Sequence, residues 1–155
     1  MKTARQLSVA LLVVLCITAL YGSYHMITDP TGVSLGLPFY LLNGTMFTDY
    51  LMAGWVLLVV VGLFSMYTMA QVLRKGKRYS FLIMLQGVLL ALFVTVQMFL
   101  LGDTFLIQYV YLFIGVLLIG LGAMQNQRRI VVETEKDAHP VLKLKSHHHK
   151  HRKHK

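Results

Sequence analysis

Four residues beside two connecting segments have side chains that could do chemistry together: His25, Asp29, Asp49 and Asp103. An imidazole among several carboxylates can bind a cation or assist hydrolysis. His25 stands four residues before Asp29, a spacing at which two side chains of one helix can pair. We therefore treat these four residues as the candidates for a ligand or cation site.

Each of the three carboxylates also fits a structural role. Asp29-Pro30-Thr31-Gly32 is a turn sequence, in which Asp accepts backbone N–H bonds and Pro and Gly occupy their favoured positions. Asp49 and Asp103 stand where apolar helices are expected to begin, and a carboxylate there caps the helix and complements its dipole. Turn and capping roles are sufficient to explain the carboxylates, and the site remains the alternative hypothesis.

A second group of chemically active side chains ends the chain, where five histidines fall within eight residues: His147, His148, His149, His151 and His154. Neutral imidazole is a good ligand for Zn²⁺, Ni²⁺ or Cu²⁺, so a transition metal is the one cofactor that the sequence suggests. Against a metal site, the neighbouring Lys and Arg residues repel a cation. The alternatives are attraction to anionic lipid headgroups, at roughly 1 kcal/mol per Lys or Arg near the surface, or a tail that serves only orientation and solubility.

Three glutamines interrupt the third and fourth apolar runs: Gln86, Gln97 and Gln108. Gln86 and Gln97 are eleven residues apart and fall on nearly one helical face. They could form a polar seam along a cavity, or hydrogen bonds between helices worth about 0.6–2 kcal/mol each. No Asp, Glu, Lys or Arg lies inside the apolar runs, which argues against a proton relay, an ion-coupled transporter or a voltage sensor.

Four apolar runs must position all of these groups, and they cover residues 7–24, 51–73, 81–101 and 105–124. Each is close to the ~20 residues that a helix needs to cross a bilayer. Because lipid offers no hydrogen bonds, such runs are helices. The composition agrees, since 56% of the residues are hydrophobic and only 14% are charged, unlike a soluble domain. A single Cys excludes an internal disulfide.

The positive charge is confined to one side of the predicted membrane domain. All 15 Lys and Arg residues lie before the first run, between the second and third, or after the fourth. With four spans these segments share a side, so the positive-inside rule predicts that both termini are cytoplasmic. The same distribution argues against nucleic-acid binding, although the net charge is +9.

The predicted fold is all-α, a four-transmembrane-helix up-down-up-down bundle, because the later connectors are short. Small residues should let helices approach closely, and they are Gly54, Gly62, Gly87, Gly115, Gly120 and Gly122. Residues 1–124 form the membrane domain. Residues 125–155 form a basic, His-rich cytoplasmic tail whose composition predicts disorder.

The first outer loop, residues 25–50, is expected to lie against the bundle rather than hang free. Its middle, residues 35–42, is too short to span the membrane and too apolar for a free loop. Pro38 can begin a short helix there, and Asn43-Gly44 can end it. We therefore predict an interfacial or re-entrant segment over the outer end of the bundle.

The same loop carries a resemblance. Asp29-Pro30-Thr31-Gly32, Leu35-Gly36-Leu37-Pro38 and Phe47-Thr48-Asp49-Tyr50, followed by Ala53-Gly54, resemble segments of small four-helix bacterial membrane proteins whose activity is uncharacterised. The resemblance covers roughly residues 21–124, and the layout is similar to that of DoxX-like proteins in architecture only. It implies a bacterial inner membrane, and it implies no activity.

Three hypotheses about function follow. The leading one is a non-enzymatic membrane protein that acts through lipid or through the helices of a membrane-protein partner. The first alternative is a ligand- or cation-binding or transport component with its site under the outer loop. The second alternative is a subunit of a membrane enzyme.

Overall fold

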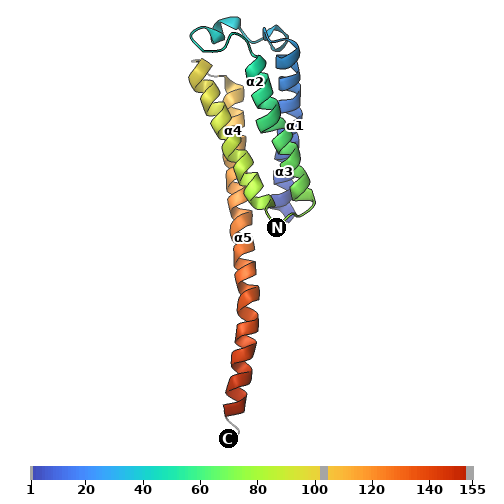
Figure 1. Ribbon diagram of the computed structural model, residues 1–155, viewed down its shortest axis with the longest axis vertical. Helices are drawn as coiled ribbons and strands as arrows, with labels where there is room; N and C mark the ends of the chain where they lie inside the picture. The colour runs from blue at the N-terminus through green and yellow to red at the C-terminus, as the bar shows by residue number, and fades with distance from the viewer. Residues whose placement is uncertain (1, 102–104, 153–155) are drawn as a thin grey trace.

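The computed structural model describes the backbone of residues 2–101 and 105–152, and the surroundings of the side chains of residues 3–135 other than 39 and 101–104. Within these residues the regular structure is entirely helical, so the predicted all-α class is confirmed. Four helices, Thr3–Thr28, Leu51–Leu73, Tyr79–Leu100 and Leu106–Glu135, are long and apolar enough to cross a membrane. Figure 1 shows them running up and down in chain order.

The first, third and fourth spans extend beyond the apolar runs that predict them, whereas the second, Leu51–Leu73, coincides with its run. α1 covers Lys2–Thr28 and α4 covers Tyr79–Leu101, so each includes polar residues at its ends. The reason is that a helix satisfies its own backbone hydrogen bonds, and it continues through the interface for as long as no residue stops it. The predicted ranges therefore mark the lipid-facing cores of the helices.

The second span is not a uniform α-helix. It consists of α2 (Leu51–Val56), the π-helix η3 (Leu57–Leu63) and α3 (Phe64–Leu73). A π-helix pairs each N–H with the carbonyl five residues back, and such segments occur frequently at functional sites. The sequence pattern of apolar residues gives no sign of this segment, since apolar side chains suit both kinds of helix in lipid.

The four spans form two tightly packed helical hairpins. α1 packs along α2, η3 and α3, while α4 packs along α5, which covers Leu106–Arg152. At the centre of the second hairpin the backbones nearly touch, because a Cβ added at Gly87 would lie 2.5 Å from the carbonyl oxygen of Gly115. A Cβ at Gly122 would lie 2.6 Å from the backbone nitrogen of Met84. The predicted role of these glycines is thus confirmed, whereas Gly120 has nothing within 4 Å of an added Cβ.

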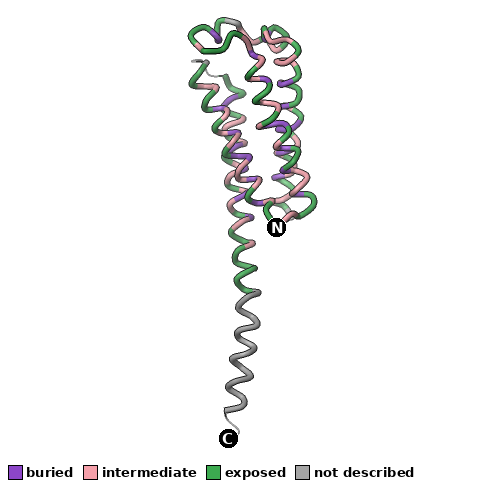
Figure 2. The backbone as a smooth tube through the Cα atoms, in the orientation of Figure 1, coloured by how far each residue is buried: buried purple, intermediate pink, exposed green. Residues whose placement is uncertain are grey.

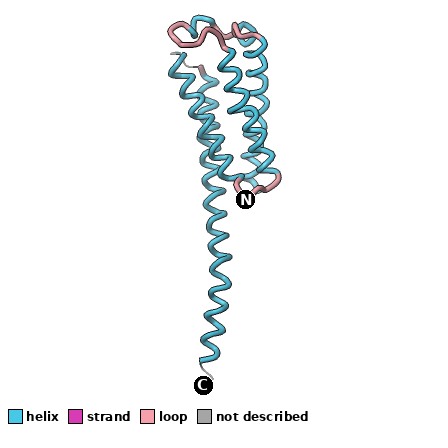
Figure 3. The backbone as a smooth tube through the Cα atoms, in the orientation of Figure 1, coloured by secondary structure: helices cyan, strands magenta, loops and turns pink. Residues whose placement is uncertain are grey.

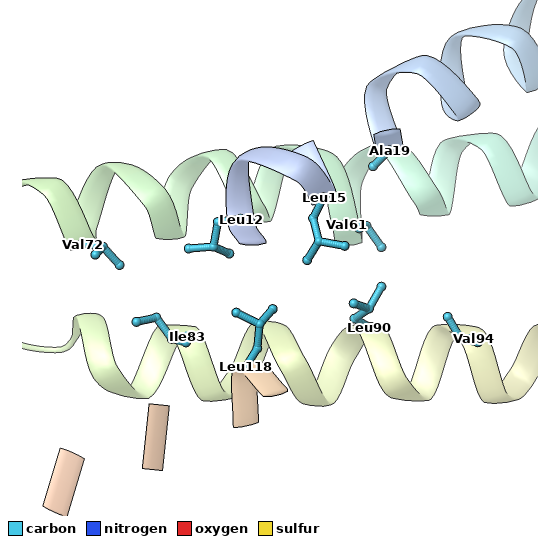
Figure 4. Close-up of a cluster of buried hydrophobic side chains, with 9 residues drawn as sticks. All are labelled: Leu12, Leu15, Ala19, Val61, Val72, Ile83, Leu90, Val94 and Leu118. Carbon is cyan, nitrogen blue, oxygen red and sulfur yellow. The ribbon is translucent and has the colours of Figure 1, made fainter. Parts of the chain in front are cut away.

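The two hairpins meet through a core of large apolar side chains. Figure 4 shows Leu12, Leu15, Val61 and Val72 pointing across the interface toward Ile83, Leu90 and Leu118. Leu12, Leu15, Ile83 and Leu118 are fully buried. These contacts fill the half of the bundle that lies nearer the charged connector and the start of α1.

The outer loop covers the other end of the bundle, as predicted (Figure 1). It contains two short 3₁₀-helices, η1 (Val33–Leu35) and η2 (Phe39–Leu42), joined by turns that Figure 3 shows as loops. Pro38 caps η2 at its start and Asn43 at its end, which confirms the predicted short helix. Leu41 and Leu42 are buried, so the segment packs onto the bundle.

The tail differs from the prediction of disorder, because α5 continues as one helix to Arg152. Figure 2 shows exposed backbone along α5 below the bundle, and residues 130–135 are all exposed. A composition poor in core-forming residues predicts that the tail packs against nothing, and the side chains of residues 130–135 are indeed exposed. A lone helix still forms its own backbone hydrogen bonds, which composition does not forbid.

Candidate functional site

The carboxylate of Asp29 organises the turn that follows α1. Its Oδ1 accepts hydrogen bonds from the backbone N–H and the hydroxyl of Thr31, and its Oδ2 accepts the N–H of Ser34 at 2.8 Å. The hydroxyl of Thr31, followed by the backbone of Ser34, lowers the pKa of Asp29. Both oxygens thus serve the predicted turn.

The other candidates of the proposed polar site do not join Asp29. The ring of His25 packs edge-on against Tyr21 and Tyr24, with centroids 4.5 and 5.6 Å away. Asp49 accepts the N–H of Leu51 at 3.1 Å, in the capping role that the sequence suggests. Across the part of the chain that the structure describes, no three His, Cys, Asp or Glu side chains come close enough to hold a metal ion.

Several sequence candidates lie beyond what the structure describes. Asp103 and His154 fall outside the described residues. His147, His148, His149 and His151 lie in the helical backbone of α5, and their side chains are also outside the description. Metal binding by the tail stays a prediction.

A cavity of about 650 Å³ lies beneath the outer loop, between the two hairpins. All four spans contribute to its wall, and most of its lining is apolar. Its deep end is formed by residues that also belong to the core, namely Ala19, Val61, Leu90 and Val94. Its roof is formed by the loop residues Leu35, Gly36, Leu37, Pro38, Leu42 and Tyr50.

The roof is fixed by a buried tyrosine. Tyr50 is only 4% exposed, and its hydroxyl donates to the carbonyl of Pro38 at 3.0 Å. Its backbone N–H donates to the carbonyl of Pro30, again at 3.0 Å. Its ring lies against Gly32, where an added Cβ would be 2.8 Å away, and the backbone there has φ +77°. Burial raises the pKa of Tyr50, with the Tyr40 phenol as the second cause.

Two of the three predicted glutamines reach the cavity. Gln97 of α4 and Gln108 of α5 both line it, together with the hydroxyl-bearing side chains of Thr18, Thr45 and Tyr111. Gln108 is 5% exposed, and its Oε1 accepts the N–H of Phe105 at 3.0 Å. The polar seam is therefore divided, because Gln86 does not line the cavity.

Gln86 lies instead in the other half of the bundle, nearer the charged connector. It is completely buried, and neither amide atom has a hydrogen-bond partner among the described residues. Ser65 and Thr68 of α3 are likewise buried with unpaired hydroxyls. Thr18 and Thr95, by contrast, donate to the carbonyl four residues back. The interhelical hydrogen bonds expected of Gln86 are not present in this arrangement.

The cavity itself has a sequence signal that the sequence analysis missed. One face of α1 carries Leu12, Leu15, Ala19 and Gly22 in order, so its side chains shrink toward the outer end. Ala53 stands at the same outer end of the second span and also lines the cavity. Large side chains fill the inner half, and small ones leave the outer half open.

Comparison of the chain with models of known protein families, with curated proteins and with solved structures finds no match. No family thus supports the DoxX-like layout, while the four-helix architecture stands on the helices themselves. The fold and the cavity define the class: a small, all-helical, multi-pass membrane protein with an apolar cavity beneath an outer lid.

Proposed function

We propose that this protein binds a lipophilic ligand in the cavity beneath the outer loop. The observation that carries the proposal is the cavity itself, whose volume of about 650 Å³ is typical of small-molecule sites. The cavity is partly open between the spans, so an apolar chain can enter it from the surrounding lipid. The proposal favours binding over catalysis, since none of the lining residues that the structure describes is a histidine or a cysteine.

The lining also restricts the polar group of the ligand. Gln97 and Gln108 offer amide groups, and Asp49 is the one carboxylate among the described residues of the lining. No described Lys or Arg lines the cavity, so a phosphate or carboxylate would meet the negative charge of Asp49 without compensation from these residues. The ligand we propose is therefore an apolar chain or ring system with an uncharged or cationic polar group.

A pair of neighbouring variants tests the proposal. Ala53→Phe places a large ring in the cavity, whereas Met52→Phe changes a side chain that is 61% exposed on the outside of the same helix. The probe is a diazirine-bearing long-chain alcohol, photo-activated with the purified protein. We expect saturable labelling at the cavity wall in the wild-type protein and in Met52→Phe, and its loss in Ala53→Phe. Equal labelling of both variants would contradict the proposal.

We further propose that the protein lies in a bacterial inner membrane with both ends in the cytoplasm. The separation of 15 basic residues from the outer loop supports this orientation. Single cysteines at Ser34 and Ser146 should then react with impermeant thiol reagents from opposite sides of the membrane. Reaction from the same side would contradict the four-span arrangement.

A second candidate function, assembly with a membrane-protein partner, rests on α5. Ile130, Val131 and Val132 are 56%, 63% and 45% exposed, beyond the part of α5 that packs on the bundle. Consecutive exposed apolar residues on a projecting helix are typical of a contact surface. Cysteine at Val131 should form a specific crosslink to a partner in native membranes, and cysteine at exposed Glu133, which lies on the opposite face of the same helix, is the matched control.

A further inference from the structure

The charged end of the bundle contains a second, smaller pocket, of about 180 Å³. It lies between the first turn of α1 (Thr3, Ala4), the first residue of α4 (Tyr79) and α5 (Met124, Gln125, Arg128). Figure 1 shows the start of α1 at the level where α5 leaves the bundle. The pocket is far larger than the roughly 15 Å³ that one water molecule needs.

The pocket is electropositive. Arg128 lines it, and the guanidinium of Arg129 lies 5.3 Å from the ring centroid of Tyr79, another lining residue. The first turn of a helix also leaves backbone N–H groups without an acceptor in the helix, and these favour an anion. None of the described residues that line it is a carboxylate. An anion held here would gain from an arginine without meeting a negative charge in the wall.

A buried amide gives the pocket a second, independent feature. Gln125 is 6% exposed, and its Nε2 donates to the hydroxyl of Ser8 at 3.0 Å. The hydroxyl of Ser8 donates its own proton to the carbonyl of Ala4 at 2.9 Å. Both contacts can exist together only if Ser8 accepts from Gln125, which fixes the orientation of the amide. Oε1 of Gln125 is then left as a buried acceptor with no partner among the described residues.

We propose that this pocket binds the headgroup of a phospholipid, with the phosphate at Arg128 and a hydroxyl or ammonium group of the headgroup donating to Gln125. The guanidinium of Arg128 suits the phosphate of a phospholipid, and the unpaired Oε1 of Gln125 suits a hydrogen-bond donor on the alcohol of the headgroup. Glycerol and ethanolamine are headgroup alcohols that carry such a donor. The site differs from the outer cavity in place and in charge, and it requires only that the protein spans a membrane.

The position of the pocket favours a lipid over a soluble phosphate. Tyr79 and Gln125 mark the level at which the apolar spans give way to the basic segments, and headgroups occupy that level of a bilayer. Phe81 and Met124 are 49% and 50% exposed just inside it, where the acyl chains of a bound lipid would lie. A basic pocket between spans at this depth is a recurrent kind of lipid site.

The test uses the full-length protein in neutral detergent, with its melting temperature followed during addition of short-chain phosphatidylglycerol, phosphatidylcholine or inorganic phosphate. We expect phosphatidylglycerol to stabilise the wild-type protein more than phosphatidylcholine, whose headgroup has no donor. Inorganic phosphate should have no comparable effect. Stabilisation by phosphate alone would overturn the assignment to a lipid, and no stabilisation by any of the three would overturn the site.

Three variants separate this site from general attraction by positive charge. Arg128→Gln should weaken phosphatidylglycerol binding by about five- to tenfold. Arg74→Gln, which removes an equal charge from an exposed residue of the basic connector, should leave it unchanged. Gln125→Leu should keep lipid binding but abolish the preference for phosphatidylglycerol over phosphatidylcholine. Equal weakening by Arg128→Gln and Arg74→Gln, or an unchanged preference in Gln125→Leu, would overturn the proposal.

Discussion

The close approach of α4 and α5 predicts that one substitution has opposite effects at two neighbouring glycines. Gly122→Ala adds a methyl group where the backbone nitrogen of Met84 is 2.6 Å away and the carbonyl oxygen of Ser80 is 2.9 Å away. Gly120→Ala, two residues earlier on the same helix, adds a methyl group with nothing within 4 Å. Helix propensity changes equally in both variants, so any difference between them reports the contact with α4.

The magnitude follows from the distances. Ordinary contact begins near 3.4 Å, so at Gly122 the two backbones must separate by about 0.8 Å. A gap of that size forfeits roughly a third of the ~0.15 kcal/mol held by each atom pair, which over ~40 pairs amounts to about 2 kcal/mol. Overpacking of close contacts in proteins costs a similar 1–3 kcal/mol or so. Gly120→Ala should instead stabilise the helix by about 0.5–1 kcal/mol.

The measurement is the free energy of unfolding of each variant in mixed micelles, titrated with sodium dodecyl sulfate and followed by circular dichroism. We expect Gly122→Ala to unfold at a lower fraction of denaturing detergent than the wild-type protein, and Gly120→Ala at an equal or higher one. If both variants shift together in the stabilising direction, the backbones of α4 and α5 do not approach as described.

Two further predictions concern the outer loop. Tyr50→Phe removes the hydrogen bond to the carbonyl of Pro38, which keeps the backbone N–H of Leu41 as a donor, so unfolding should become easier by about 0.5–1.5 kcal/mol; an unchanged melting curve would mean that the hydroxyl does not fix the roof. Hydrogen bonds to the ionised carboxylate lower the pKa of Asp29. The stability that these bonds give to the turn is therefore complete above pH 3.8, the ordinary pKa of Asp, and it is lost when the carboxylate is protonated as the pH falls through the lowered pKa. The protection factor of the Ser34 amide against hydrogen exchange should therefore fall below that pH, and in Asp29→Asn it should be low at neutral pH as well; equal protection in both proteins at neutral pH would refute this.

The architecture was predictable because lipid leaves a chain few choices. Four apolar runs in which the backbone must pair with itself can only be helices, and short connectors make them antiparallel neighbours. The short helix after Pro38 was also predictable, since proline favours the start of a helical turn. The π-helix Leu57–Leu63 was not, because its residues are the same β-branched and leucine side chains that any span contains.

The candidate site was predictable in place but not in composition. The outer loop does cover a cavity, yet His25 and Asp29 are engaged elsewhere and only Asp49 of the described polar candidates lines it. The eleven-residue spacing placed Gln97 and Gln86 on one face of the same helix. Only Gln97 lines the cavity, because Gln86 lies in the other half of the bundle. Helical spacing shows which residues share a face of a helix. Whether a residue on that face lines a cavity or is buried between helices depends on where along their length the helices are in contact.

The two ends of the bundle are therefore built on opposite principles. At the inner end, Leu12, Leu15 and Ile83 draw the hairpins together, and the charged residues lie just beyond this packed layer. At the outer end, Ala19 and Gly22 replace the leucines on the same face of α1, so the hairpins are separated by a cavity, and no basic residue lines it within the described part of the chain. A lipophilic group in that cavity would add the contacts that these small residues lack, and it would stabilise the bundle where its own packing is weakest. The ligand would thus act as part of the core, which explains why a lid fixed by Tyr50 closes over a space with so few polar groups.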